Sequence, residues 1–196
     1  MIVTGEPRSG TSLTMALLDR MVVPIACDPD KRGSSYETSG TGVPGMLPVS
    51  KIRAAHGSAI KLLCVPAQKR LRDFGPGIVF CTRTASEQVA SQIKFFQAAL
   101  DVSLPGRTDL LEQFVDAQNR SMPDAFVRAV GRHVLTMPFE DTIERPREAC
   151  ERLAAFAGVD PGEAWRHVRI RDPACAIDLS IELSLMHAAC RAKSAN

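Results

Sequence analysis

The chain has 196 residues, of which 45% are hydrophobic and 23% charged, so it can bury a globular core without disulfides or metals. A net charge of +2 argues against a nucleic-acid coat, and an aromatic content of 5% argues against rows of base-stacking rings. No run approaches the roughly 18 apolar residues of a membrane span. The apolar start is cut too early, and lacks the basic flank, for a signal peptide.

The six cysteines are widely spaced, and no two of them form a CxxC pair. This pattern is typical of free thiols in a reducing compartment, so we expect a cytoplasmic protein without structural disulfides. A zinc site needs paired Cys or His at short spacing, which this sequence does not supply. We therefore expect no bound metal.

The first quarter of the chain predicts a strand, a tight loop and a helix, followed by a long polar loop. Residues 1–5 are apolar and end at a glycine, and residues 10–21 carry apolar side chains at helical spacing. Residues 22–27 form a second short apolar run. Residues 28–48 are rich in Gly, Ser, Thr, Asp and Pro and show no period. Ordered loops of this length are usually functional, so this segment is a candidate active-site loop.

The middle of the chain repeats the alternation of apolar runs and helical patterns. A short helix is expected at 49–55, a buried strand at 59–65 and a basic helical stretch around 69–72. The basic stretch is typical of a solvated helix face. A second buried strand at 78–81 leads into a helix that ends near Leu100.

The remaining elements are helices with one further strand. Two helical stretches at 108–119 and 123–131 are interpreted as a lid or an acceptor-binding region. A strand is expected at 133–139 and a helix at 146–157. A last amphipathic helix at 179–192 could pack on its own core or on a partner, so the oligomeric state stays open.

This alternation predicts an α/β fold: one domain over residues 1–196, with a mainly parallel central sheet between two layers of helices. Ligands of such folds bind beyond the carboxyl ends of the strands. The two most polar strand exits are residues 5–12 and 82–91, which makes them the candidate site.

The first strand exit matches the spacing G-x4-G-x-[ST] of a phosphate-binding loop between a strand and a helix. Such a loop wraps an anion with its N–H groups, and the helix N-terminus adds positive potential. The candidate donor-binding residues here are Gly5, Pro7, Arg8, Ser9, Gly10, Thr11 and Ser12. Thr11 stands where P-loop triphosphatases carry Lys, which argues against ordinary ATP or GTP hydrolysis.

The run from Pro7 to Ser12 resembles the phosphosulfate-binding loop of sulfotransferases, whose donor is 3′-phosphoadenylyl sulfate (PAPS). The resemblance implies the family's P-loop fold, and it implies that Arg8 binds the 5′-phosphosulfate and neutralises the leaving phosphate. A positioned guanidinium has the right chemistry, because sulfuryl transfer builds negative charge on the bridging oxygen.

A second, separate match lies at the other polar strand exit. Arg83 follows the strand at 78–81, and Ser91 comes eight residues later in the next helix. The resemblance implies that Arg83 and Ser91 grip the 3′-phosphate of the donor. Weaker similarities are the segment DPDKRGSSYE and residues 134–157, where Phe139 stands at a Tyr position of the family. The resemblance covers about residues 1–158.

The general base is less clearly marked. Cytosolic sulfotransferases carry a His after a strand that residues 60–66 resemble, but no His is present here. Other members carry a Glu some twenty residues beyond the loop cation. Asp30 and Glu37 in the polar loop are therefore our candidate catalytic carboxylates, together with Arg8 as the catalytic cation. Glu6, inside the loop, either orients Arg8 or repels unsuitable anions.

The predicted function is sulfuryl transfer from PAPS to a hydroxyl or amine of an acceptor that the sequence does not identify. The runner-up is a P-loop kinase that uses ATP and Mg²⁺ to phosphorylate a metabolite or a modified nucleobase, and only that alternative involves nucleic acid. A non-catalytic nucleotide-binding module is the third interpretation. None of the three implies a membrane partner.

Overall fold

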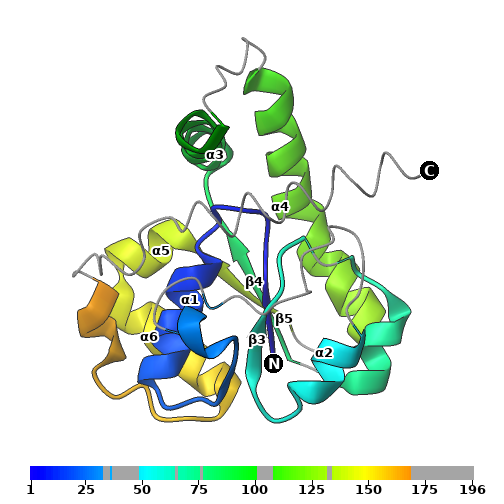
Figure 1. Ribbon diagram of the computed structural model, residues 1–196, viewed down its shortest axis with the longest axis vertical. Coiled ribbons are helices and arrows are strands. Elements are labelled where there is room, and N and C mark those ends of the chain that lie inside the picture. The colour runs from blue at the N-terminus through cyan, green and yellow to red at the C-terminus, as the bar shows by residue number, and fades with distance from the viewer. Residues whose placement is uncertain are drawn as a thin grey trace.

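The computed structural model describes residues 1–32, 36, 49–64, 66–75, 77–100, 108–131 and 134–168. Glu37, most of the polar loop at 28–48 and the helix expected at 179–192 lie outside these residues. Figure 1 shows a central sheet with helices on both sides and two helices, α3 and α4, that extend beyond one edge of it.

The sheet is the five-stranded, parallel α/β core that the alternation predicted. Its spatial order is β2-β3-β1-β4-β5, and all four strand pairs are parallel. The strands are β1 (Ile2–Thr4), β2 (Ile25–Ala26), β3 (Ala59–Lys61), β4 (Ile78–Thr82) and β5 (Val134–Pro138). The first strand is therefore central, with β3 and β4 on either side of it.

The helices divide between the two faces of the sheet. In Figure 1, α1, α5 and α6 lie on one side, and α2 and the lower half of α4 lie on the other. The α-helices are α1 (Thr11–Arg20), α2 (Val49–Ala54), α3 (Ala85–Leu100), α4 (Thr108–Val130), α5 (Phe139–Glu144) and α6 (Pro146–Ala157). Three 3-10 helices complete the described chain: η1 (Pro29–Lys31), η2 (Lys69–Phe74) and η3 (Ala164–Val168).

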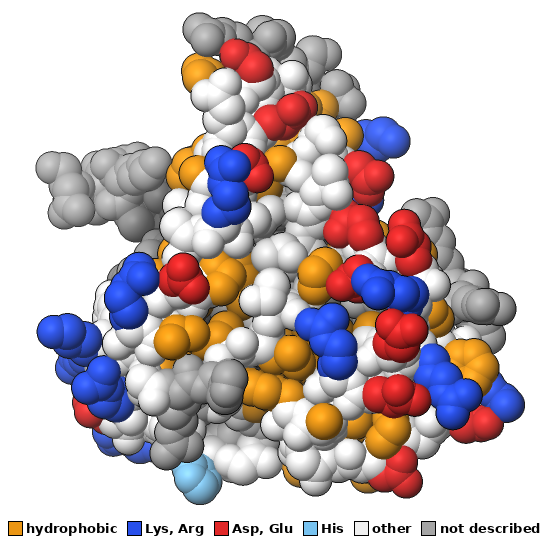
Figure 2. Space-filling view, turned by 180° about the vertical axis from the view of Figure 1, so that it is seen from behind, with side chains coloured by type: hydrophobic (Ala, Val, Ile, Leu, Met, Phe, Trp, Pro, Cys, Tyr) orange, Lys and Arg blue, Asp and Glu red, His pale blue; other side chains and the backbone are white. Residues whose placement is uncertain are grey.

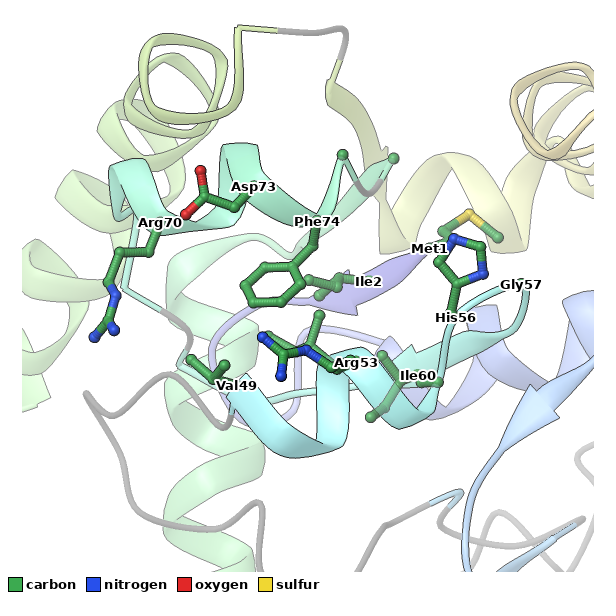
Figure 3. A pocket seen from close by; sticks show the side chains of 14 residues that line it. Met1, Ile2, Val49, Arg53, His56, Gly57, Ile60, Arg70, Asp73 and Phe74 are labelled. Atoms are coloured by element: carbon green, nitrogen blue, oxygen red, sulfur yellow. The ribbon is translucent and has the colours of Figure 1, made fainter.

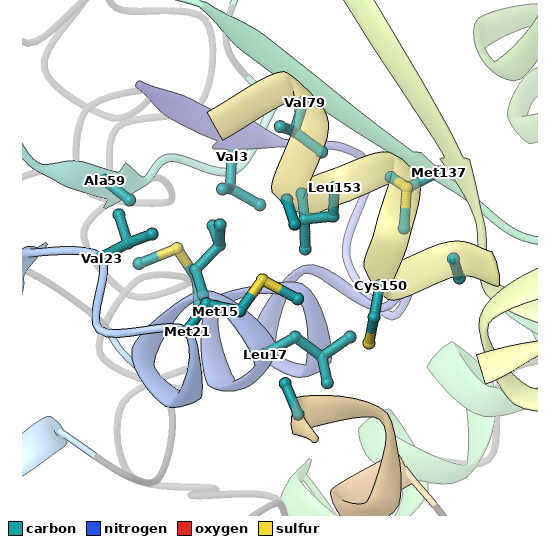
Figure 4. Packing of buried hydrophobic residues seen from close by; sticks show 14 of the residues in the cluster. Val3, Met15, Leu17, Met21, Val23, Ala59, Val79, Met137, Cys150 and Leu153 are labelled. Carbon is teal, nitrogen blue, oxygen red and sulfur yellow. The ribbon is translucent and has the colours of Figure 1, made fainter. Parts of the chain in front are cut away.

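Each face of the sheet has its own apolar core, because alternate side chains of a strand point to opposite faces. Val3 and Val79 pack with Met15 of α1 and Leu153 of α6 (Figure 4). The alternate positions Ile2, Ile60 and Ile78 pack on the other face with side chains of α2, η2 and α4. The two cores hold the carboxyl ends of β1, β3 and β4 side by side.

Two strands, β2 and β3, are shorter than the sequence predicted by four residues each. The run 22–27 contributes only Ile25–Ala26, and the side chain of Val22 is 85% exposed with a positive φ of 61°. The strand in the run 59–65 ends at Lys61, although the amides of Leu62 and Cys64 still donate to the carbonyls of Val3 and Gly5 at 2.9 and 3.2 Å. Cys64 then adopts a positive φ of 51°. In both cases the apolar run is longer than the regular strand within it.

The prediction of two helices at 108–119 and 123–131 was wrong, because α4 is continuous from Thr108 to Val130 with Pro123 inside it. A proline interrupts the hydrogen-bond ladder of a helix and usually ends or kinks it. Here Val115 before the proline and Phe126 after it are both buried, so packing on either side of Pro123 favours continuation. The short helix α5 was also not predicted.

The surface has no single dominant charge. Figure 2 shows Lys and Arg side chains interspersed with Asp and Glu, as the net charge of +2 implies, with hydrophobic side chains gathered near the centre of this face. The four cysteines within the described residues are free thiols. Within the same residues, no helix is long and apolar enough to cross a membrane.

Candidate functional site

The phosphate-loop motif lies between the central strand β1 and helix α1. The backbone turns back on itself where the amide of Ser9 donates to the carbonyl of Glu6 at 3.1 Å. Arg8 and Gly10 both adopt positive φ, at 71° and 100°. Gly10 precedes α1 and offers no side chain to cap it, so the first amides of the helix have no side-chain acceptor at this position. An anion in the loop would accept hydrogen bonds from such amides.

The position of the loop follows from the topology. The chain leaves β1 for α1 on one face of the sheet, whereas it leaves the adjacent strand β4 for α3, which packs against α4 beside the opposite core. Adjacent strands whose connections go to opposite faces leave a crevice beyond their carboxyl ends. The loop and the Arg83 region follow the carboxyl ends of β1 and β4, where this rule predicts the crevice.

Two cations lie at the loop, one within it and one on the neighbouring strand β3. Arg8 Nε donates to Ser91 Oγ at 3.1 Å, which joins residues 83 positions apart. Lys61, at the end of β3, donates from Nζ to Ser12 Oγ at 3.0 Å. The Lys61 side chain is only 3% exposed, and burying an ammonium group is costly unless polar or anionic groups surround it. This buried cation marks the loop as a site for a negative charge.

Two glutamines of α3 hold the loop in place. Gln88 and Gln92 are buried, and each donates from Nε2 to the carbonyl of Pro7 at 2.9 Å. Their spacing of four residues places them on one face of the helix, directly against the loop. The position of Arg8, the next residue, is therefore tied to α3.

Arg83 lies at the exit of β4, surrounded by polar and aromatic groups. Its guanidinium lies 4.6 Å from the centre of the Phe139 ring, and its Nη2 is 3.3 Å from Glu87 Oε2. Asn119 of α4 donates to the Arg83 carbonyl at 2.9 Å. Since about a fifth of the Arg83 side chain is exposed, it can still reach a ligand in the crevice.

The buried polar atoms that lack a partner gather in this region. Within the described part of the chain they are Ser9 Oγ, Arg83 Nε, Gln88 Oε1 and Asn119 Oδ1. Leaving a buried donor or acceptor unpaired costs about 1–3 kcal/mol, so native structures rarely leave several together without a ligand or water. All four belong to the loop, to the Arg83 exit or to the helices packed on them. They fit a polar ligand bound at this edge.

The carboxyl of Glu6 is also at this edge, and the residue is half-buried. Burial raises the pKa of Glu6, and a hydrogen bond of 3.5 Å from Cys64 Sγ to its Oε2 opposes part of that rise. Burial and the Glu6 charge together raise the pKa of the Cys64 thiol to about 12. The thiol therefore stays protonated at neutral pH and acts as a donor to Glu6.

We expect Glu6→Gln to stabilise the ligand-free protein at pH 8 and to change its stability little at pH 4. Because the pKa of Glu6 is raised on folding, the folded chain holds this proton over a pH range in which the unfolded chain has lost it. The stability of the natural chain therefore falls as pH rises through that range, and the Gln variant lacks this loss. Melting curves of both proteins from pH 4 to pH 8 measure the difference.

Glu144→Gln replaces an exposed carboxylate at the end of α5 and is the matched control. Its melting temperature should not rise above that of the natural chain as the pH increases. The prediction is contradicted if the difference in melting temperature between Glu6→Gln and the natural chain does not increase with pH.

The structure brings most of the predicted site residues to one edge, but not all. Arg8, Ser12, Arg83 and Ser91 lie around the crevice, as described above. Asp30 is exposed on η1, which follows the edge strand β2, so β3 separates its strand from the loop strand β1. Glu37 lies outside the described residues. Across the described chain, no three His, Cys, Asp or Glu residues gather as metal ligands.

Sequence reasoning missed Lys61 as a site residue, although the signal was present. A lysine inside an otherwise apolar strand is unusual, because lysine is almost never fully buried without a partner. The two glutamines were missed as well. The only signal for them in the sequence was their spacing of four residues on the helix that carries Ser91.

No family model matches the chain, and no curated protein matches it in sequence. Among solved structures, it is similar to the mouse sulfotransferase SULT7A1 complexed with PAP. The two share 10% identity at a TM-score of 0.49, and the match covers 86% of this chain. It covers 63% of the mouse chain, so this chain spans less than two thirds of that protein.

Proposed function

We propose that the chain is a PAPS-dependent sulfotransferase that moves a sulfuryl group to a hydroxyl or amine acceptor by in-line transfer. The observation that carries the proposal is the hydrogen bond of 3.0 Å from Lys61 Nζ to Ser12 Oγ. In P-loop triphosphatases the Ser or Thr at this point of the loop holds Mg²⁺. Here a buried ammonium lies beside that hydroxyl, and a second cation next to it would be repelled.

The residues of the crevice suit a donor with anionic groups at two places. Arg8, Lys61 and the amides that begin α1 would hold the phosphosulfate, and Arg83 with Ser91 would hold the 3′-phosphate. When bound, the donor supplies the sulfuryl group and a phosphate leaving group. The guanidinium of Arg8 and the ammonium of Lys61 would stabilise negative charge where it develops. The glutamine contacts to Pro7 keep Arg8 in position before the donor arrives.

The base that accepts the proton from the acceptor is proposed from three carboxylates. Asp30 and Glu37 remain the candidates from the polar loop. Glu6 is a third candidate, because burial raises its pKa toward the pH at which the enzyme would work. A base whose pKa lies near the working pH is the most effective one. Glu6 lies in the loop that follows β1, and Asp30 lies on η1, which follows β2.

Adenosine 3′,5′-bisphosphate should stabilise the protein without magnesium. A ligand at 100 times its dissociation constant adds about 2.7 kcal/mol, which raises the melting temperature of a chain of this size by about 5–11 °C. The double variant Arg83→Ala with Ser91→Ala should lose most of this shift, because both groups are proposed to hold the 3′-phosphate. The exposed Arg147→Ala, on α6, is the matched control and should keep it.

Stabilisation by ATP with magnesium, and not by the bisphosphate, would overturn the proposal in favour of the kinase. If the bisphosphate raised the melting temperature of the natural chain and of the double variant equally, Arg83 and Ser91 would not hold the 3′-phosphate. Incubation of PAPS with phenol, alcohol and amine acceptors, followed by measurement of the bisphosphate released, then tests for turnover and identifies the acceptor class.

A further inference from the structure

A cavity of about 580 Å³ lies at the amino-terminal edge of the sheet, opposite the phosphate loop. It is partly open to solvent and is lined by α2, by η2 and by the first residues of β1 and β3 (Figure 3). The proposed donor site borders the carboxyl ends of the same strands. The two sites are therefore separated by the length of the strands, and this cavity is not an extension of the crevice.

The floor of the cavity is apolar. Ile2 and Ile60 are buried strand residues, and Ile52 of α2 is buried beside them. Phe74 of η2 is half-buried, and Figure 3 shows its ring in the middle of the lining, next to Ile2. A volume of this size with an apolar floor is typical of pockets that hold small organic molecules.

The rim of the cavity is basic. Arg53 of α2 and Arg70 of η2 are exposed lining residues, and neither has an ion-pair partner among the described residues. In contrast, Arg32, Arg145 and Arg166 each pair with a carboxylate elsewhere on the surface. Among the described residues of the lining, Asp73 is the only acid, so their side chains carry an excess of positive charge.

We propose that this cavity binds a small amphipathic anion, with an aryl or branched aliphatic body and one carboxylate or sulfonate group. The apolar body would displace water from the isoleucines and Phe74, and its anionic group would bind the guanidinium groups of Arg53 and Arg70. Guanidinium groups suit carboxylates and sulfonates because they donate two parallel hydrogen bonds. This proposal does not depend on the reaction at the other edge.

Fluorescence titration of the full chain with 8-anilinonaphthalene-1-sulfonate tests the proposal, since this dye has an aryl body and one anionic group. We expect saturable binding at one site per chain. Arg53→Gln with Arg70→Gln should weaken it about tenfold, because the charge-assisted hydrogen bonds are lost. The matched control, Arg147→Gln with Arg166→Gln, should leave it unchanged. The uncharged N-phenyl-1-naphthylamine should bind both double variants equally.

Two further measurements test whether the dye binds in this cavity. Val49→Trp places a large ring at the cavity wall and should block both dyes, and a melting curve checks that each variant is folded. Adenosine 3′,5′-bisphosphate should not displace the dye. The proposal is overturned if no saturable site is found, if binding survives both the charge and the filling variants, or if the bisphosphate competes.

Discussion

Replacing Lys61 by Met should lower turnover with PAPS by about 100- to 1,000-fold without destabilising the ligand-free protein. This range is typical for the loss of one positioned donor that stabilises developing negative charge. Lys61 is suited to that role because its ammonium is buried and lies 3.0 Å from Ser12 Oγ in the phosphate loop. The affinity for adenosine 3′,5′-bisphosphate should also fall, by about 10- to 100-fold, since hydrogen bonds to charged groups contribute about 1.5–3 kcal/mol.

Lys61→Met should not lower the stability of the ligand-free protein, although it lowers turnover. Taking an ammonium group out of water is costly, and Met fills nearly the same volume without a charge. We therefore expect the melting temperature of the ligand-free Lys61→Met protein to equal or exceed that of the natural chain. This combination, lower activity with unchanged or higher stability, is typical of a residue kept for function.

Lys94→Met is the control, because Lys94 is an exposed lysine on α3 near the same edge. It should alter neither turnover nor melting temperature. If Lys61→Met melted several degrees lower and bound the bisphosphate normally, the lysine would be a structural residue.

The architecture could be predicted because its determinants are local. The strand at Ile78–Thr82 and the helix at Pro146–Ala157 were predicted nearly to the residue, since an apolar run or a helical period defines each of them. The length of the edge strand Ile25–Ala26 was overestimated, because it depends on pairing with β3 and not on the composition of the strand itself. The continuity of α4 across Pro123 depends on tertiary packing, which outweighs local propensity.

The candidate site was predictable only where its residues follow one another or recur at a fixed spacing. The loop and the pair Arg83 and Ser91 were proposed as site residues in this way. The contact between Arg8 and Ser91 joins residues 83 positions apart, and that between Lys61 and Ser12 spans 49 positions. Such contacts depend on the order of strands β3, β1 and β4 in the sheet, which spacing along the chain does not specify.

Gly5→Ala should have the largest effect on stability, with an expected loss of about 3 kcal/mol. An added Cβ would lie 2.5 Å from both the Cys81 carbonyl oxygen and Ser9 Oγ. The first of these atoms is backbone in the neighbouring strand β4, which cannot turn aside as a side chain can. Overpacking of this kind costs about 1–3 kcal/mol, and a loss at the upper end lowers the melting temperature of a chain this long by about 6–12 °C.

Gly158→Ala separates this steric effect from the general cost of replacing a glycine. Gly158 ends α6 at a φ of 71°, and an added Cβ there would meet nothing within 4 Å. Only the left-handed backbone is then penalised, at about 1–2 kcal/mol. Thermal denaturation of both variants should show the larger loss for Gly5→Ala, together with weaker binding of adenosine 3′,5′-bisphosphate. If both variants lost the same stability and Gly5→Ala still bound the bisphosphate, β1 and β4 would be able to separate at the loop. The close approach of the two strands at Gly5 would then not be needed to shape the site.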